Sequence, residues 1–158
     1  MSTHYPIAAF VYLSKASHCF STEQLDELIQ QAAEQNGRFG ITGFLHYCAD
    51  NQRFLQYIEG DSKPLSQLIQ NIHADKRHQL IRSLNDESVP VHRFRDWKMK
   101  RINTAKMRFV GLERILTDVM QLEVPSTERQ HFMRDPIWGI VNSIAQLESS
   151  RLKLNEPL

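Results

Sequence analysis

The chain of 158 residues has few cysteines, no excess of charge of either sign and no long apolar run. Its two cysteines, Cys19 and Cys48, lack the spacing of a metal site, so we expect both to be reduced thiols. The 19 Lys and Arg residues nearly balance the 18 Asp and Glu residues, so the net charge favours neither nucleic acid nor a membrane surface. Because no signal peptide is visible either, we expect a soluble cytoplasmic protein.

The usual catalytic motifs are also absent. Gly37, Gly40 and Gly43 follow a predicted helix, whereas the dinucleotide fingerprint needs a different spacing and a helix after it. There is no P-loop, and no Ser/His/Asp or Cys/His triad can be argued from the order of residues. His73 and His78 are too far apart to share one helical face, so no metal site is expected.

The hydrophobic pattern predicts five strands and two helices in the order βαββαββ. Ser21 and Gln24 have the spacing of a capping box before the first helix, and Gly37 is a plausible stop after it. The predicted strands are Ile7–Ser14, Ile41–Cys48, Arg53–Glu59, Leu80–Val91 and Phe94–Ile102, and the predicted helices are Thr22–Asn36 and Pro64–Ala74.

This order is typical of an α+β fold, the ferredoxin-like sheet with its two helices on one face. The other face would be bare unless the C-terminal region covers it. Two helical stripes are available there, one at Leu112, Ile115, Leu116, Val119 and Met120, the other at Ile137, Ile140, Val141, Ile144 and Leu147 behind Asp135-Pro136. We therefore predict a domain over 1–103 and a helical extension over 104–158.

One glutamine breaks the pattern of its strand. Gln56 alternates with Phe54 and Ile58 and so shares their apolar face. A buried primary amide without a hydrogen bond costs about 1–3 kcal/mol. Either the strand lies at the edge of the sheet with Gln56 solvated, or a polar group lies opposite it.

Asn36 and Tyr12 break the patterns of their elements in the same way. Asn36 follows Leu25 by eleven residues, about three full helical turns, and therefore points along the buried stripe, although it could merely close the helix. Tyr12 shares an apolar strand face with Ala8 and Phe10, where most tyrosines are structural. Two amides and a phenol converging under the helices would suit a planar heterocycle that carries donors and acceptors.

The order of these residues resembles the BLUF domains, small flavin-binding sensors of blue light, from about Ile7 to Ile102. The resemblance rests on five motifs in sequence: Val11-Tyr12-Leu13-Ser14, Asn36 before Gly40-Ile41-Thr42-Gly43, Phe54-Leu55-Gln56 followed by Ile58-Glu59-Gly60, Asp75-Lys76-Arg77-His78, and Phe94-Arg95-Asp96-Trp97-Lys98-Met99. It implies the fold inferred above, with the flavin ring between the two helices.

The resemblance also implies roles for individual residues. Tyr12 would be the electron and proton donor, and Gln56 the switching amide between Tyr12 and the N5 and O4 edge of the flavin. Asn36 would hold the polar edge of the ring, which Leu28 and Ile72 would sandwich. The remaining matched positions are Phe54, Asp75, Arg77 and His78 near the ring or its side chain, and Trp97 and Met99 on a strand that responds to light. Ala32 and Gln35 depart from the family pattern, in which Ser and Asn or His are common.

The implied cofactor is FAD, with FMN or riboflavin as alternatives, and the implied function is photoreception without enzymatic activity. The signal would pass to a protein partner or a homo-oligomer, with no direct contact to nucleic acid or membrane. Two other classes remain open. One is a small ferredoxin-like enzyme that uses Arg77 and His78 on a planar or anionic metabolite. The other is an interaction module that uses the Ile137–Leu147 stripe.

Overall fold

The computed structural model describes residues 7–102 and 137–146. It confirms the predicted order of elements, with most boundaries within a few residues of those expected. The elements are β1 (Ile7–Ala16), α1 (Thr22–Gly37), β2 (Thr42–Cys48), β3 (Arg53–Asp61), α2 (Ser62–Ala74), β4 (His78–Val89) and β5 (Lys98–Ile102), followed by a helix over residues 137–146. Within these residues, no helix has the length and apolar character needed to cross a membrane.

The five strands form one mixed sheet in the order β4-β1-β3-β2-β5. β1 pairs with β3 and β4 in antiparallel fashion, β2 pairs with β3 in the same way, and β2 and β5 are parallel. β3 is therefore the central strand, with β1 on one side and β2 on the other. An edge position for Gln56 is ruled out, because it lies on β3 and is only 7% exposed.

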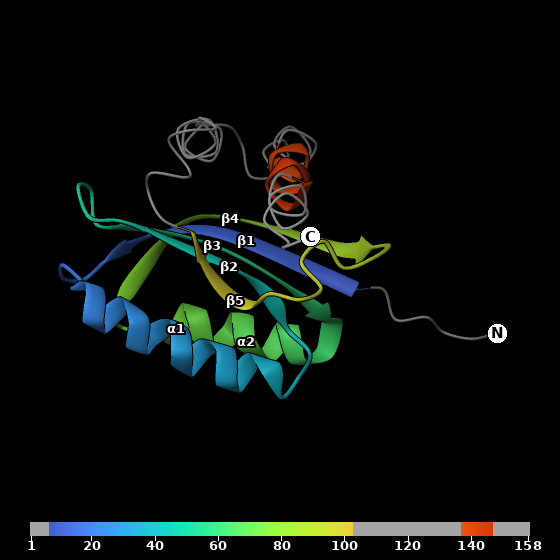
Figure 1. Ribbon diagram of the computed structural model, residues 1–158, viewed down its shortest axis with the longest axis horizontal. Coiled ribbons are helices and arrows are strands. Elements are labelled where there is room, and N and C mark those ends of the chain that lie inside the picture. Colours follow the sequence, from blue (N-terminus) through green and yellow to red (C-terminus); the bar gives the residue numbers. More distant parts are fainter. Residues whose placement is uncertain (1–6, 103–136, 147–158) are drawn as a thin grey trace, which may run out of the picture.

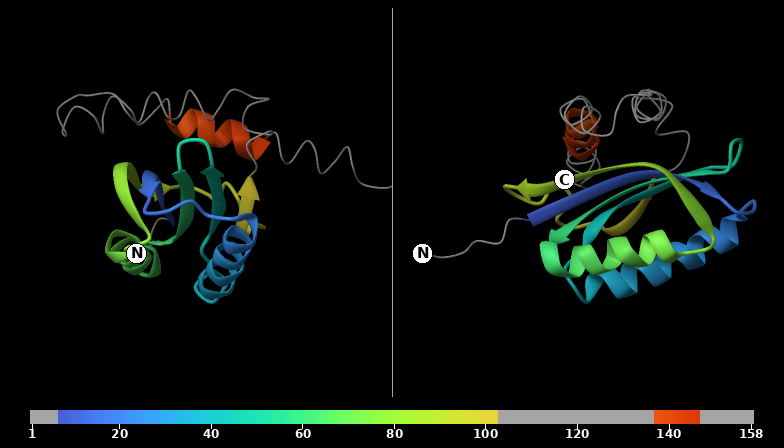
Figure 2. Two further views of the ribbon diagram at one scale, coloured as in Figure 1. Left: turned by 90° about the vertical axis from the view of Figure 1, so that its left-hand side faces the viewer. Right: turned by 180° about the vertical axis from the view of Figure 1, so that it is seen from behind.

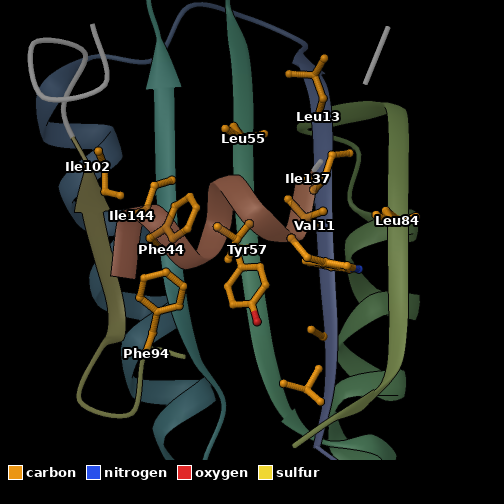
Figure 3. Packing of buried hydrophobic residues seen from close by; sticks show 14 residues of the cluster. Val11, Leu13, Phe44, Leu55, Tyr57, Leu84, Phe94, Ile102, Ile137 and Ile144 are labelled. Carbon is orange, nitrogen blue, oxygen red and sulfur yellow. The ribbon is translucent and has the colours of Figure 1, made fainter. Parts of the chain in front are cut away.

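Helices cover both faces of the sheet. α1 and α2 lie side by side on one face, and helix 137–146 crosses the other (Figures 1 and 2). Its Ile137, Trp138, Val141 and Ile144 join the buried cluster of that face, as Figure 3 shows for Ile137 and Ile144. This confirms the predicted cover by the second stripe. The stripe at 112–120, Asp135-Pro136 and Leu147 lie outside the described residues, and the division at 103 stays a prediction.

α1 begins with the predicted capping box. The Ser21 hydroxyl accepts from the Gln24 N–H at 3.1 Å, and the Gln24 side chain accepts from the Ser21 N–H at 2.9 Å. The predicted stop was wrong: Gly37 is the last helical residue, and the left-handed position falls at Gly40, with φ 68°. The buried residues of α1 are Leu25 and Asn36, as their spacing of three turns predicted.

Replacing Ser21 by alanine is expected to lower the free energy of unfolding by about 1 kcal/mol, because one helical N–H loses its acceptor. Chemical denaturation of the two proteins measures the difference. Ser66→Ala is the matched control: Ser66 is exposed within α2, where alanine favours the helix slightly. A Ser21 variant as stable as the wild type would show that the cap contributes nothing.

β5 carries a bulge that places Met99 and Trp97 on opposite faces. Lys98 pairs with Gly43 and Lys100 with Phe44, so Met99 is the extra residue, and its φ is 136°. Met99 packs in the cluster under α1 and α2, whereas Trp97 packs against the cluster of the opposite face. The prediction that these two side chains share a face was wrong, because it assumed unbroken alternation along the strand.

Candidate functional site

A cavity of about 230 Å³ lies between α1, α2 and the sheet. All ten residues predicted to bind a cofactor line it, together with Tyr12. The lining residues are Tyr12, Phe20, Leu28, Gln31, Ala32, Gln35, Asn36, Leu45, Phe54, Gln56, Leu68, Asn71, Ile72, Asp75, Arg77 and His78. Residues from six elements, β1, α1, β2, β3, α2 and β4, and from the loops between them therefore line one cavity that only the tertiary fold creates.

Tyr12, Gln56 and Met99 form a chain of polar contacts along the sheet side of the cavity. Tyr12 and Gln56 are directly opposite each other in the β1–β3 register, and the Tyr12 hydroxyl donates to Gln56 Oε1. Gln56 Nε2 lies 3.2 Å from Met99 Sδ, to which it donates. The polar partner expected opposite Gln56 is thus Tyr12, and Met99 is the second partner of the same amide.

The Tyr12 phenol is held in its neutral form. The side chain is 4% exposed, and burial, with the nearby Asp75 carboxylate as a smaller cause, raises its pKa well above the ordinary value of 10. Its ring lies edge-on to the His78 ring at 5.6 Å between centroids. The neutral phenol keeps its O–H, which donates the hydrogen bond to Gln56 Oε1.

His78 is fixed by two contacts beside Tyr12. Its Nδ1 lies 2.7 Å from the hydroxyl of the fully buried Ser14, and its Nε2 lies 3.0 Å from the Ile72 carbonyl. Because a carbonyl can only accept, Nε2 carries a proton and donates to it. The imidazole therefore forms a fixed wall of the cavity and ties β1 to the end of α2.

The helix side of the cavity combines apolar walls with a buried amide. Leu28 and Ala32 from α1 face Leu68 and Ile72 from α2 across it. The Asn36 side chain is 4% exposed, and no other described residue hydrogen-bonds its amide. A buried amide is normally paired, so the Asn36 amide is a group of the cavity lining that could bond a bound molecule.

Asp75 and Arg77 form an ion pair at the more open side of the cavity. The Arg77 guanidinium donates to both Asp75 oxygens, with Nη2 2.6 Å from Oδ2, and the side chains are 51% and 27% exposed for Arg77 and Asp75. These bonds lower the pKa of the Asp75 carboxyl below its usual value. The pair leaves charged groups where a ligand would extend from the cavity toward solvent.

Sequence reasoning missed five lining residues: Phe20, Gln31, Leu45, Leu68 and Asn71. Leu68 could have been found, because it precedes Ile72 by one helical turn and so lies on the same face of α2. Phe20 lies in the segment between β1 and α1, where no periodic signal exists. Among the described residues, no group of His, Cys, Asp or Glu could hold a metal ion.

A ferredoxin-like sheet with a cavity under its helices, lined by apolar walls and by amide and phenol groups, defines a domain that binds a small planar molecule. Residues 7–100 match the family model "BLUF: Sensors of blue-light using FAD". The chain belongs to the BLUF family, as its motifs indicated.

Solved structures agree with this assignment. A bacterial light-regulated adenylyl cyclase is 26% identical, with a TM-score of 0.60, and the match covers 71% of this chain and 34% of the cyclase. BlrP1 of Klebsiella pneumoniae, solved with FMN and cyclic diGMP, is also 26% identical, with a TM-score of 0.58 and coverage of 70% and 30%. BlrB, a BLUF protein in its dark state, shares the fold at 24% identity and a TM-score of 0.63, with coverage of 89% and 96%.

The chain thus spans about a third of the length of the cyclase and of BlrP1, but nearly all of BlrB. No curated protein matched the sequence.

Proposed function

We propose that this chain is a blue-light photoreceptor in which Tyr12 and Gln56 change their hydrogen bonding beside a non-covalently bound flavin. The observation that carries the proposal is the chain from the Tyr12 hydroxyl through Gln56 to Met99, on the wall of a cavity between two helices. Both ends of the amide are engaged, so a turn of the amide about its side chain changes its contacts with Tyr12 and with Met99 together.

The cavity fits a flavin ring in size and chemistry. Its volume of about 230 Å³ is below the roughly 300–1,000 Å³ of pockets that enclose whole drug-sized ligands. It therefore suits the ring, with the rest of the cofactor extending past Asp75 and Arg77. Leu28 and Ile72 would hold the two faces of the ring, and Asn36 would bond its polar edge. FAD is the cofactor named for the family, and FMN or riboflavin would place the same ring in the same walls.

A bound flavin would supply the absorption of blue light and, once excited, a strong one-electron oxidant. Tyr12 is the phenol of the cavity lining, and its O–H already points at Gln56 Oε1. An electron lost from Tyr12 makes that O–H strongly acidic, so its proton moves along the existing hydrogen bond to the amide. Return of the electron and proton restores the phenol, but the amide need not return to its first arrangement.

The alternative arrangement of Gln56 exchanges its oxygen and nitrogen. Tyr12 can accommodate this exchange, because a hydroxyl both donates and accepts. Met99 cannot, because a thioether only accepts and the amide oxygen brings no proton to it. The exchanged form therefore gives up the contact to Met99, and its N–H becomes available to a carbonyl of the flavin. Donation to that carbonyl would shift the flavin absorption to longer wavelength without a lasting redox change.

The signal is proposed to pass to a protein partner or to another copy of the chain, with no enzymatic step in the sensor itself. Helix 137–146 supports this route, because it packs directly on the sheet that carries Gln56. The free thiols of Cys19 and Cys48 suit the reducing cytoplasm as its location. In the cyclase and in BlrP1, the region similar to this chain is part of a longer chain. This supports the proposal that a separate protein or domain receives the signal.

The two other functional classes gain no support. Arg77 is paired with Asp75, and His78 is held between Ser14 and the Ile72 carbonyl. Both side chains are thus bound to protein groups rather than directed at a substrate of an enzyme. The apolar stripe of helix 137–146 is buried against the sheet, so it is not available for docking another protein.

Purified protein is expected to be yellow and to show a reversible red shift of the flavin absorption after blue light. Asn36→Ala should weaken flavin binding by about 1–3 kcal/mol, because a buried donor and acceptor pair is lost. Titration of apoprotein with FAD measures this. Asn85→Ala, at an exposed position of β4, is the control and should bind as the wild type does. A colourless protein that cannot be reconstituted with any flavin would refute the proposed function.

A further inference from the structure

Glu59 is a buried acidic residue on the face of the sheet opposite the cavity. Its carboxylate is fully buried and accepts four hydrogen bonds. The donors are the Thr42 hydroxyl at 3.3 Å, the Tyr57 hydroxyl at 2.9 Å, the Arg93 N–H at 2.9 Å and the Phe94 N–H at 2.6 Å. Burying a carboxylate is costly unless its lone pairs are satisfied, so this arrangement fixes all four partners.

Two of those donors belong to the backbone of the segment 92–97, which leads into β5. Glu59 therefore holds this segment by its main chain. At the other end of the segment, the Trp97 carbonyl accepts from the Gly43 N–H at 2.8 Å. A Cβ atom at Gly43 would lie 1.9 Å from the Tyr57 carbonyl oxygen, so only glycine permits this close approach.

The segment also reaches the C-terminal helix. Arg93 Nη1 donates to the Tyr57 hydroxyl at 2.8 Å, and Arg93 Nε donates to Asn142 at 2.6 Å. The guanidinium lies 5.1 Å from the Trp138 ring centroid, within the range of a cation–π contact. Figure 3 shows Tyr57 and Phe94 beside helix 137–146 on this face of the sheet.

Two residues beyond the segment, Met99 has a strained backbone. Its φ of 136° is rare for a residue with a side chain and costs about 1–3 kcal/mol, which the surrounding contacts must hold in place. One of those contacts is the hydrogen bond from Gln56 Nε2 to Met99 Sδ. Strain at this point means that losing the contact releases a backbone held away from its preferred conformation.

We propose that Glu59 is a positioning residue that couples the Gln56–Met99 contact on the cavity face to Arg93 and helix 137–146 on the opposite face. The inference rests on the proposed role of Gln56. When the amide turns away from Met99, the strained turn at Met99 relaxes, and the segment clamped by Glu59 transfers that movement to Arg93. Arg93 then changes its contact with Trp138 and Asn142.

The two tryptophans of the chain, Trp97 and Trp138, are natural reporters of this route. Trp97 packs on Phe94 at 4.7 Å between centroids, and Trp138 packs on Arg93 and on Tyr57. Fluorine NMR of the flavin-bound protein labelled with fluorotryptophan gives one resonance for each, assigned by Trp97→Phe and Trp138→Phe. In the wild type, blue light is expected to shift both resonances as the flavin absorption shifts to the red.

Glu59→Gln should keep the red shift and lose the light-induced shifts of both tryptophans, because an amide cannot accept from all four donors. Arg93→Met, at a half-buried position, should keep the red shift and the Trp97 response but lose the Trp138 response. If Glu59→Gln does not fold, the Arg93→Met variant alone tests the proposed coupling. Asp26→Asn is the matched control: this exposed carboxylate contacts Arg101 of β5 at 3.4 Å, and both responses should persist.

Wild-type tryptophan responses in folded Glu59→Gln, or a wild-type Trp138 response in Arg93→Met, would overturn the coupling while leaving the photoreceptor intact. Loss of the red shift in flavin-bound Glu59→Gln would also overturn it, because Glu59 would then act on the photochemistry itself. A wild-type protein that binds flavin and shows no red shift would instead refute the proposed function.

Discussion

Replacing Tyr12 by phenylalanine is expected to abolish the light-induced red shift while the flavin stays bound. The hydroxyl is the donor to Gln56 Oε1, and Tyr12 is the phenol that lines the cavity. Phenylalanine keeps the ring and its packing on Phe10 but has neither an O–H to donate nor a readily oxidised oxygen. The amide then receives no proton after excitation and has no reason to rearrange. Difference absorption spectra before and after blue light measure the effect.

Tyr47→Phe is the matched control for this variant. Tyr47 is also a buried tyrosine in the cluster under the helices, and its hydroxyl accepts from the Phe20 N–H at 3.1 Å. Its loss should cost about 1 kcal/mol of stability and leave the red shift unchanged. A red shift of normal size in Tyr12→Phe would show that another residue supplies the electron and proton.

Periodicity predicted most of this fold, because each element has one face against a core and its residues follow the period of that element. Leu25 and Asn36 illustrate this on α1, where a spacing of eleven residues placed both on the buried side. The helix end was less predictable. Glycine is the usual residue at the end of a helix, and both Gly37 and Gly40 fit that position. Only the path of the chain from α1 into β2 decides that Gly40 takes the positive φ.

The partners of the site residues could not be predicted, because they depend on strand register. Alternation placed Tyr12 and Gln56 on apolar faces, but a shift of either strand by one residue would have turned its side chain to the other face of the sheet. The sequence order of β1 and β3 carries no information on that register, and the family resemblance supplied the pairing instead. The structure places the two residues directly opposite each other.

Met99 marks the limit of reasoning from alternation. A residue two positions after Trp97 should share its face, yet the bulge at Met99 inserts one extra residue and reverses that expectation. The bulge is set by contacts distant in sequence, including the bond from the Gly43 N–H to the Trp97 carbonyl. As a result, Met99 rather than Trp97 contacts Gln56.

Replacing Gln56 by leucine is expected to remove the red shift completely and to leave flavin binding largely intact. Leucine fills a similar volume but neither accepts from Tyr12 nor donates to Met99, so both ends of the chain are broken. The buried Tyr12 hydroxyl then lacks its acceptor, which should cost about 1–3 kcal/mol of stability. Absorption spectroscopy and chemical denaturation of the same preparation measure the two effects.

Two further variants separate the roles of the amide. Gln56→Glu keeps an oxygen for the Tyr12 hydroxyl but, as a carboxylate, has no N–H for Met99 or for the flavin, so its red shift should also be lost. The double variant Tyr12→Phe with Gln56→Leu removes both partners of one hydrogen bond and should recover part of the stability lost in Gln56→Leu alone, since no buried hydroxyl is left unpaired. A red shift of normal size in Gln56→Leu would exclude the amide from the switch, and a normal shift in Gln56→Glu alone would exclude only its N–H donor.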